Sequence, residues 1–323
     1  MDTRTNTPKL PQYDLSVVIP AYNEADSIDD LLSALEGFCA SVDYRIQFVF
    51  VDDGSEDDTV ALINKARIRG GDIKLVKLSK NFGAHEAIRA GIYSSDADRI
   101  IFYSADMPEP VGSIGLFYEK LLEGYELVYS ERIGYSGGVG SRVYAKLVKK
   151  AVRIDYPENG LISVGFGRKI KEELNKNIEA SSSIFFQIFS LGFRRIGIPV
   201  EFNQRLHGTS KWTLRKKIRH SLDVFVMFSY LPIHAISILG FLLFALGLIW
   251  ALVIIISKLI VPDALASGWP TTISVLLIGF GITNLSLGII AEYLARTLIA
   301  SRPRPVFVID EVIEVSDRLQ QTQ

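Results

Sequence analysis

The chain before residue 230 alternates short apolar runs with amphipathic segments. The apolar runs have the length of buried strands and lie at residues 15–20, 46–51, 73–78 and 99–104. Apolar positions recur with helical spacing in the intervening segments 27–40, 59–70 and 84–95. Because strands that alternate with helices form right-handed βαβ units, the pattern predicts an α/β domain around a largely parallel sheet.

Two local signals refine this prediction. Ser27 followed by Asp30 resembles a capping box, with Asp in place of the usual Glu, and this places the start of the first helix at Ser27. Near the other end of the chain lies the segment "RPRPVFVIDEVIEV" at residues 302–315. We expect this segment to return as a strand onto the α/β domain.

Two long apolar segments follow, at residues 232–257 and 271–291, and neither contains an acid, a lysine or an arginine. Each reaches the roughly 20 residues that a helix needs to cross a bilayer. A pair of buried helices in a soluble core is the weaker alternative, because such helices are rarely so long and uniformly apolar. The segments therefore predict two transmembrane helices.

Charges that flank the two spans predict their orientation. Lysines and arginines cluster before the first span and after the second, whereas the connecting loop holds only Lys258 and Asp263. The positive-inside rule then places both termini and the large N-terminal domain in the cytoplasm. The stretch 212–230 has one apolar and one basic helical face, which is typical of a helix lying in the headgroup plane, although an ordinary surface helix shows the same pattern.

These observations give a predicted domain order. It comprises a flexible tail (1–13), an α/β domain (14–209), an interfacial helix (210–230), a first span (231–257), an outer loop (258–270), a second span (271–295) and a cytoplasmic tail (296–323).

Composition narrows the class of protein. The net charge is −1, which argues against a nucleic-acid-binding protein with a basic surface. Cys39 is the sole cysteine, so no intrachain disulfide forms. The N-terminal stretch has no apolar core of a signal peptide.

Acidic side chains follow three of the predicted strands, and they are the main candidates for chemistry. They are Glu24, Asp52, Asp53 and Asp106. Ligands of open α/β sheets bind outside the carboxyl ends of the strands, where these side chains would converge. Carboxylates suit a hard divalent cation that bridges to a diphosphate. Turn formation and helix capping are the alternative roles, and we assign them to Asp57 and Asp58.

Several motifs together resemble those of the inverting glycosyltransferases with the GT-A fold. The motifs "SVVIPAYNEADSI", "FVFVDDGSEDDT", "LSKNFGAHEAIRAG", "SADMPEP" and "RLHGTSKW" occur in this order. The two predicted spans make the chain similar to the polyprenyl-phosphate glycosyltransferases, a group that includes bactoprenol glucosyltransferases and dolichyl-phosphate mannose synthase. The resemblance runs from residue 14 to residue 310. It implies a Rossmann-like GT-A domain followed by the interfacial helix and the two spans.

The resemblance implies roles for particular residues on the donor side. Pro20, Tyr22 and Glu24 match the first nucleotide-contacting loop, and Asp52 and Asp53 match an acidic pair near the base and ribose. Asp106 matches the last acid of the DxD-like motif, which holds Mg²⁺ or Mn²⁺ against the diphosphate.

The acceptor phosphate is expected to meet cations at the membrane surface. Arg205, Ser210 and Lys211 stand at the head of the interfacial helix, and Arg132 matches an arginine that follows the next strand. For Arg205 and Lys211 the alternative is a purely topogenic charge. For Arg132 the alternative is a solvated surface position. His207 could likewise contact the phosphate or be an ordinary exposed loop residue.

This chain also departs from the family pattern. Ser104 replaces the first acid of the DxD-like motif, and the stretch near Ile162 and Gly167 lacks the acids that relatives carry, with Glu158 as a substitute candidate. A general base is dispensable if the acceptor phosphate is already a dianion, because its second pKa is about 6.

The predicted function is a metal-dependent transfer of one hexose, glucose from UDP-glucose, to undecaprenyl phosphate, with inversion, at the cytoplasmic membrane face. GDP-hexose donors, a homo-oligomer and a partner flippase are compatible with the resemblance. Two alternatives remain open. One is a processive polysaccharide synthase, against which the two spans and the missing QxxRW motif argue. The other is a catalytically weak scaffold that binds lipid phosphate.

Overall fold

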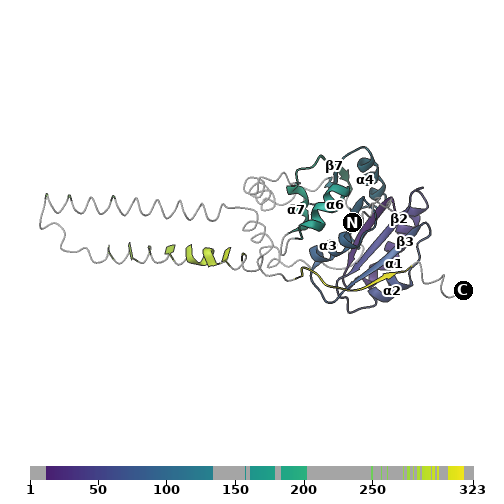
Figure 1. The fold of residues 1–323 in the computed structure, drawn as a ribbon, viewed down its shortest axis with the longest axis horizontal. Coiled ribbons are helices and arrows are strands. Elements are labelled where there is room, and N and C mark those ends of the chain that lie inside the picture. The colour runs from purple at the N-terminus through teal and green to yellow at the C-terminus, as the bar shows by residue number, and fades with distance from the viewer. Residues whose placement is uncertain are drawn as a thin grey trace, which may run out of the picture. The chain divides into compact units, whose positions relative to one another are not determined.

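The computed structural model describes residues 12–133, 157, 161–178, 183–201 and 305–315, together with scattered positions between 249 and 297. The chain divides into two compact units (Figure 1). The first, here called the α/β unit, comprises residues 1–149, 153–213 and 304–323. The second unit comprises residues 150–152 and 214–303.

A mixed sheet forms the centre of the α/β unit. Its strand order is β7-β5-β6-β4-β1-β2-β3-β8 in the described part of the chain. The strands are β1 (Leu15–Ala21), β2 (Ile46–Asp52), β3 (Gly71–Leu78), β4 (Ile100–Phe102), β5 (Leu127–Arg132), β6 (Val164–Phe166), β7 (Arg195–Val200) and β8 (Ile309–Glu314). The four strands predicted from the apolar runs are confirmed and pair in parallel as β4-β1-β2-β3. The sheet is not parallel throughout, because β6 and β8 run antiparallel to their neighbours.

Helices cover both faces of the sheet. They are α1 (Ala25–Cys39), α2 (Thr59–Lys65), α3 (Ala84–Ser94), α4 (Ser113–Leu122), α6 (Arg168–Lys176) and α7 (Ile184–Ser190). Alternate residues of each strand point to opposite faces. Val17 and Ile19 therefore pack with α1, α2 and α4, whereas Val18 packs with α3, α6 and α7. Both faces are apolar, which explains why the strands read as continuous apolar runs.

Helix α1 begins earlier than its predicted cap, and the capping-box prediction for Ser27 was wrong. Glu24 occupies the N-cap position, and buried Ser27 lies inside the first turn, where its hydroxyl donates to the Glu24 carbonyl oxygen. The helix starts earlier because side chains of the β2–α2 loop accept hydrogen bonds from its first backbone N–H groups. Glu24 N–H donates to Thr59 Oγ1 (2.9 Å) and Ala25 N–H donates to Asp57 Oδ2 (3.1 Å). Asp57 thus caps helices, as predicted.

The second predicted helix ends early, whereas the predicted C-terminal strand is confirmed. Helix α2 stops at Lys65, because Ala66 is extended and the chain turns into β3 through Gly70, whose φ is +84°. Strand β8 pairs antiparallel with β3, so the end of the chain belongs to the sheet.

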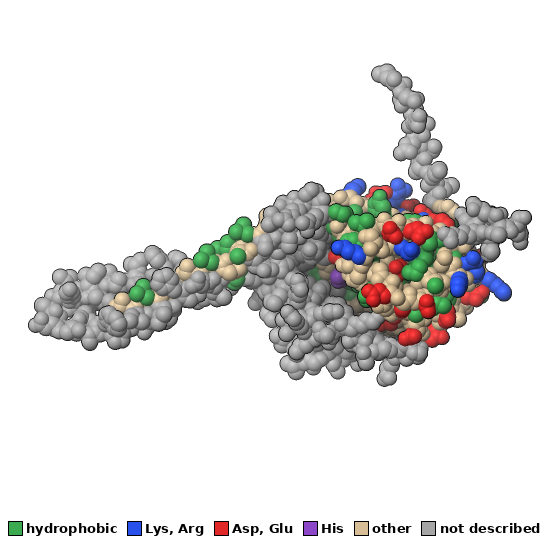
Figure 2. Space-filling view, turned by 90° about the horizontal axis from the view of Figure 1, so that it is seen from below, with side chains coloured by type: hydrophobic (Ala, Val, Ile, Leu, Met, Phe, Trp, Pro, Cys, Tyr) green, Lys and Arg blue, Asp and Glu red, His purple; other side chains and the backbone are tan. Residues whose placement is uncertain are grey.

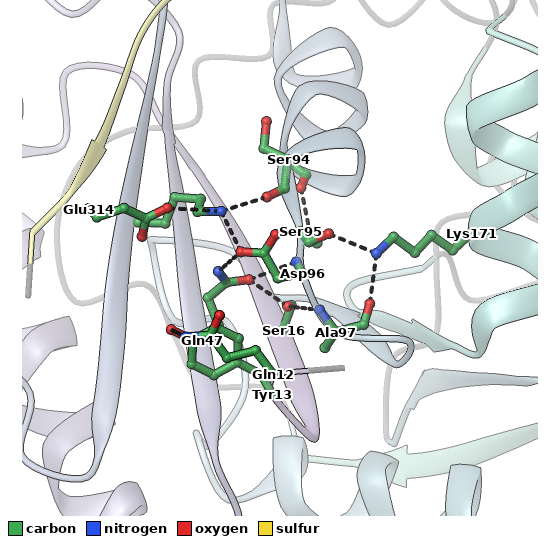
Figure 3. Close-up of polar contacts among 12 residues, drawn as sticks. Gln12, Tyr13, Ser16, Gln47, Ser94, Ser95, Asp96, Ala97, Lys171 and Glu314 are labelled. Carbon is green, nitrogen blue, oxygen red and sulfur yellow. Dashed lines mark hydrogen bonds and ion pairs between the residues drawn. The ribbon is translucent and has the colours of Figure 1, made fainter. Parts of the chain in front are cut away.

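A polar network holds the end of the sheet where the parallel strands begin (Figure 3). The ammonium of buried Lys74 contacts the Asp96 carboxylate and lies 3.0 Å from Glu314 on β8. Gln47 also donates to Asp96, and Lys171 of α6 donates to carbonyl oxygens that follow α3. The network therefore connects β2, β3, β8, α6 and the end of α3.

The second unit is described at only a few positions. Those between residues 272 and 297 are helical, and their side chains are uncharged in sequence and in Figure 2. Val275, Leu287 and Leu294 are exposed there. Among the described residues no helix is long and apolar enough to cross a membrane. Most of the predicted interfacial helix and spans lies outside the described residues, so these elements stay predictions.

Asp96→Ala should lower the free energy of unfolding by about 1–3 kcal/mol, because Lys74 and Gln47 lose a charged acceptor. Urea unfolding followed by circular dichroism measures the change. Glu123→Ala is the control, because the ion pair of Glu123 with Lys120 is exposed and should contribute about 0–1 kcal/mol. Equal losses in the two variants would show that the network adds no stability.

The stability lost in Asp96→Ala should depend on pH and should be smaller in acid. Burial alone raises the pKa of Asp96, but hydrogen bonds from Lys74 and Gln47 outweigh burial and lower it. The stabilisation is therefore complete above the unfolded pKa of about 3.9 and is lost as pH falls through the folded pKa. Wild type and Asp96→Ala should converge in stability toward acid. A difference that widens toward acid would contradict this assignment.

Candidate active site

Strand register brings four loops to one edge of the sheet. Ala21 pairs with Asp52, which pairs with Lys77, so β1, β2 and β3 end side by side. Phe102 pairs with Val18 on the other side of β1, which sets the exit of β4 beside that of β1. The loops β1–α1, β2–α2, β3–α3 and β4–α4 therefore share the carboxyl edge, where α/β sheets bind ligands.

Asn23 joins the first two loops. Its backbone has a φ of +52°, a left-handed conformation that asparagine tolerates better than most residues. Its N–H donates to Ser55 Oγ (3.0 Å), and its side-chain oxygen accepts from Glu56 N–H (2.9 Å). The β1–α1 loop, which carries the predicted nucleotide contacts Tyr22 and Glu24, is thereby fixed to the β2–α2 loop.

Asp53 joins the second loop to the third. Its carboxylate is 3% exposed and accepts Phe82 N–H (2.7 Å) and Gly83 N–H (2.9 Å), one on each oxygen. Burial raises the pKa of Asp53 and nearby Asp52 adds to the rise, although the two backbone hydrogen bonds act to lower it. Asp53 thus holds the β3–α3 loop. Its predicted contact with the nucleotide stays a prediction.

Asp52 and the remaining first-loop residues line the same edge. Asp52 is also 3% exposed, and its Oδ1 accepts Ser55 N–H (3.1 Å). Pro20 and Tyr22 are half-buried at the end of β1, and Glu24 Oε2 accepts the Ser27 hydroxyl (3.2 Å). The structure therefore brings the predicted donor-side residues together at one edge.

The β4–α4 loop supplies the predicted metal carboxylate. Ser104 Oγ donates to Asp106 Oδ1 (2.6 Å), and both residues are half-buried. Ser104 carbonyl oxygen accepts Met107 N–H, and Met107 has a φ of +45°. This tight turn fixes the direction of Asp106 relative to β4.

A divalent cation fits this arrangement with Asp106 as its protein ligand. No cluster of three or more potential metal-binding side chains exists among the described residues. Mg²⁺ needs none, since it commonly binds through one or two carboxylates plus substrate phosphates. Ser104 does not replace the missing acid as a charge, but its hydrogen bond orients the acid that remains.

The acceptor side is described only in part. Arg132 ends β5 and pairs with Val200 of β7, which places its backbone at the sheet, but its side chain lies outside the description. Arg205, Ser210, Lys211, His207 and Glu158 lie outside the described residues. Their predicted roles stay predictions.

The family model of glycosyl transferase family 2 matches residues 16–196, which run from β1 to the start of β7 and include all four loops. The chain belongs to glycosyl transferase family 2. The match and the mixed sheet confirm the predicted GT-A-like α/β domain.

Curated relatives match nearly the whole of this family 2 chain. An undecaprenyl-phosphate 4-deoxy-4-formamido-L-arabinose transferase of Pseudomonas paraeruginosa is 31% identical over 310 residues, covering 94% of this chain and 91% of the relative. The uncharacterized glycosyltransferase YkcC of Bacillus subtilis is 26% identical over 309 residues, covering 94% and 95%.

Among solved structures, glucosyl-3-phosphoglycerate synthase of Mycobacterium tuberculosis, in complex with Mn²⁺ and UDP, is 18% identical with a TM-score of 0.49. The alignment covers 67% of this chain and 78% of that chain.

Sequence reasoning found Asp53 but missed the other residues that join the loops of this family 2 domain. Asn23 and Ser55 carry no charge that draws attention, and Gly54 is one glycine among 25. Gly54 has a φ of +71°, and an added Cβ would lie 2.7 Å from both Asn81 N and Lys80 C. Its signal in the sequence is its place after two acids at a strand exit, where a loop must pass close by.

Gly54→Ala should disrupt the carboxyl edge of this family 2 domain, because both the φ and the contact with Lys80 and Asn81 exclude a side chain. We expect nucleotide diphosphate affinity to fall at least about tenfold and the free energy of unfolding by more than about 2 kcal/mol. Calorimetric titration with UDP and GDP and urea unfolding give the two values.

Gly192→Ala is the matched control for backbone strain alone. Gly192 has the same φ of +71° but no atom within 4 Å of an added Cβ. It should lose only the strain of about 1 kcal/mol and keep its nucleotide affinity. Similar affinity losses in both variants would show that the close approach of the loops is unimportant.

Proposed function

We propose that this family 2 chain transfers one sugar from a nucleotide sugar to a polyprenyl phosphate, with inversion at the anomeric carbon. The observation that carries the proposal is the end-to-end match to undecaprenyl-phosphate transferases, which extends beyond the family domain to 94% of the chain. The carboxyl-edge loops supply a matching donor site. The residues after position 213 would supply the membrane side.

The donor would lie across the β1–α1, β2–α2 and β4–α4 loops. Backbone and side-chain hydrogen bonds hold the first two together, so the nucleotide would meet a preformed edge. Asp106 would hold a divalent cation, which neutralises charge that develops on the departing nucleotide diphosphate. Ser104 orients Asp106 through its hydrogen bond.

The acceptor phosphate is its own nucleophile in this proposal. Its second pKa of about 6 makes most of it a dianion at neutral pH, so attack needs no general base. The described stretch near Ile162 and Gly167 agrees with such chemistry, because it holds no acid between Leu161 and Gly167. Arg205, Lys211 and Arg132 would then position the phosphate and balance its charge.

The proposal also includes the identity of the sugar donor. UDP-glucose was predicted from the family resemblance alone. Several of the relatives carry the name of a 4-deoxy-4-formamido-L-arabinose transferase, and those names contain no glucose. We keep UDP-glucose as the first donor to test and place formamido-arabinose-type and GDP-linked donors beside it.

We also propose that the second unit holds the enzyme at the cytoplasmic face of a membrane. The apolar segments 232–257 and 271–291 and their basic flanks support this placement. Exposed apolar side chains on the described helical positions agree with it. A homo-oligomer and a flippase that uses the product are further expectations of the same proposal.

Asp106→Asn should abolish transfer while the fold is kept, because the amide cannot replace a charged metal ligand. Detergent-solubilised protein would receive Mn²⁺, undecaprenyl phosphate and a panel of labelled nucleotide sugars, with lipid-extractable label as the readout. We expect label from one donor and a loss of at least about a hundredfold in the variant.

Glu56→Gln is the matched control, because Glu56 is an exposed acid of the β2–α2 loop whose backbone N–H, which the substitution keeps, is what holds Asn23. It should keep near-wild-type transfer. Label retained by Asp106→Asn would overturn the metal assignment. No label from any donor, in folded wild type, would instead favour the lipid-phosphate-binding scaffold, and polymeric product would favour a processive synthase.

A further inference from the structure

Glu109 is a buried acid that the proposed reaction does not use. It lies at the end of the loop that carries Asp106, and it is 1% exposed. No ion pair joins it to a lysine or arginine among the described residues. Burying a carboxylate without a cation is costly, so a structural or functional reason is needed for its presence.

The loop is fixed at Glu109 by both its backbone and its side chain. The Tyr103 hydroxyl, itself fully buried, donates to the Glu109 carbonyl oxygen. Ser113 Oγ, in the first turn of α4, donates to Glu109 Oε1 (3.2 Å). Glu109 thus connects the exit of β4 to the start of α4.

Two further strands meet the same carboxyl group. Ser130 of β5 and Ser163 immediately before β6 are both fully buried, and Ser163 N–H donates to Ser130 Oγ (2.9 Å). The hydroxyls of Ser163, Ser113 and Ser130 neighbour the Glu109 carboxyl group and act to lower its pKa. Burial has the larger effect and raises the pKa of Glu109.

Two buried polar atoms without hydrogen-bond partners indicate the protonation state of the Glu109 carboxyl group. Glu109 Oε2 and Ser163 Oγ are both buried and have no hydrogen-bond partner within the described part of the chain. A neutral carboxylic acid carries an O–H donor, whereas a carboxylate only accepts. A proton on Oε2 would remove the buried charge and give Glu109 a donor for the buried serine hydroxyls that surround its carboxyl group.

The position of Glu109 links it to both halves of the proposed site. Only Met107 and Pro108 separate it from Asp106, and proline and the tight turn at Met107 make this spacer stiff. Ser130, on its other side, stands two residues before Arg132 at the end of β5. A shift of Glu109 would therefore move Asp106 relative to β5.

We propose that Glu109 is a positioning residue, which fixes the Asp106 loop against β5 and β6 and so sets where the Asp106 carboxylate meets the donor diphosphate. The part that concerns the diphosphate rests on the proposed function. The part that concerns the loop does not, because it follows from the contacts of Glu109 alone.

The test compares Glu109→Gln, Glu109→Ala and Glu119→Ala in the full chain. Glutamine keeps the shape of the neutral acid, with an acceptor and a donor, whereas alanine removes both. Glu119 is an exposed glutamate of helix α4, which follows Glu109, and serves as the matched control. Each protein is measured by hydrogen–deuterium exchange of residues 103–112 and by transfer kinetics as a function of Mn²⁺ and acceptor concentration.

We expect Glu109→Ala to exchange faster over residues 103–112 and to need roughly tenfold to a hundredfold more Mn²⁺ for half-maximal transfer. Its KM for undecaprenyl phosphate should change by less than its Mn²⁺ requirement, because Asp106 lies on the same loop as Glu109, whereas Arg132 is linked to Glu109 only through β5. Glu109→Gln should restore the Mn²⁺ requirement and the exchange rate to near wild type. Glu119→Ala should resemble wild type in both.

The two proposals fail in different ways. If folded wild type transfers no sugar, the proposed function fails, while the exchange experiment still tests whether Glu109 holds the loop. If wild type is active but Glu109→Ala keeps its Mn²⁺ requirement, the positioning role is wrong. A Glu109→Gln variant as impaired as Glu109→Ala would also contradict it, because the neutral acid would then not be the form that positions the loop.

Discussion

The carboxyl edge depends on the close approach of the β2–α2 and β3–α3 loops. Asp53 can accept two backbone N–H groups only because Gly54 lets the chain at Lys80 and Asn81 come within contact distance. A side chain at Gly54 would separate the two loops, and the buried Asp53 carboxylate would then lose its N–H donors. Unpaired buried charge is among the most costly defects in a fold, so the two loops hold or fail together.

Buried charged side chains are stabilised differently at the two ends of the sheet. At the end where the parallel strands begin, Lys74 is paired with two acids and stabilises the return of β8 to β3. At the carboxyl edge, Asp53 and Glu109 are buried without a cation partner among the described residues, and backbone amides or hydroxyls serve instead. Ion pairs thus anchor the frame, whereas backbone amides and hydroxyls hold the buried acids of the carboxyl edge.

Sequence alone predicted the frame because apolar patterning determines it. The strands at 15–20, 46–51, 73–78 and 99–104 were predicted from residue type and spacing, and the structure confirms them together with the expected strand near the C-terminus. The cap at Ser27 was predicted wrongly because the amides of Glu24 and Ala25 find partners in a loop more than 30 residues away. Local capping rules cannot anticipate such a partner, since its position follows from strand register.

The same limit explains which site residues were found. Asp52, Asp53 and Asp106 are charged and follow strands, so a sequence pattern indicates them. Asn23, Gly54 and Glu109 act through backbone conformation, close approach or burial, which no pattern in one sequence displays. Glu109 shows the consequence most clearly, because its place in "SADMPEP" suggests another exposed loop acid, whereas its buried contacts connect β4, α4, β5 and β6. Ser104 stands where the DxD-like motif has its first acid, so the placement of Asp106 depends on the loop that carries it. The Ser104 hydroxyl orients the Asp106 carboxylate, and the contacts of Glu109 with Tyr103 and Ser113 hold the other end of the same loop.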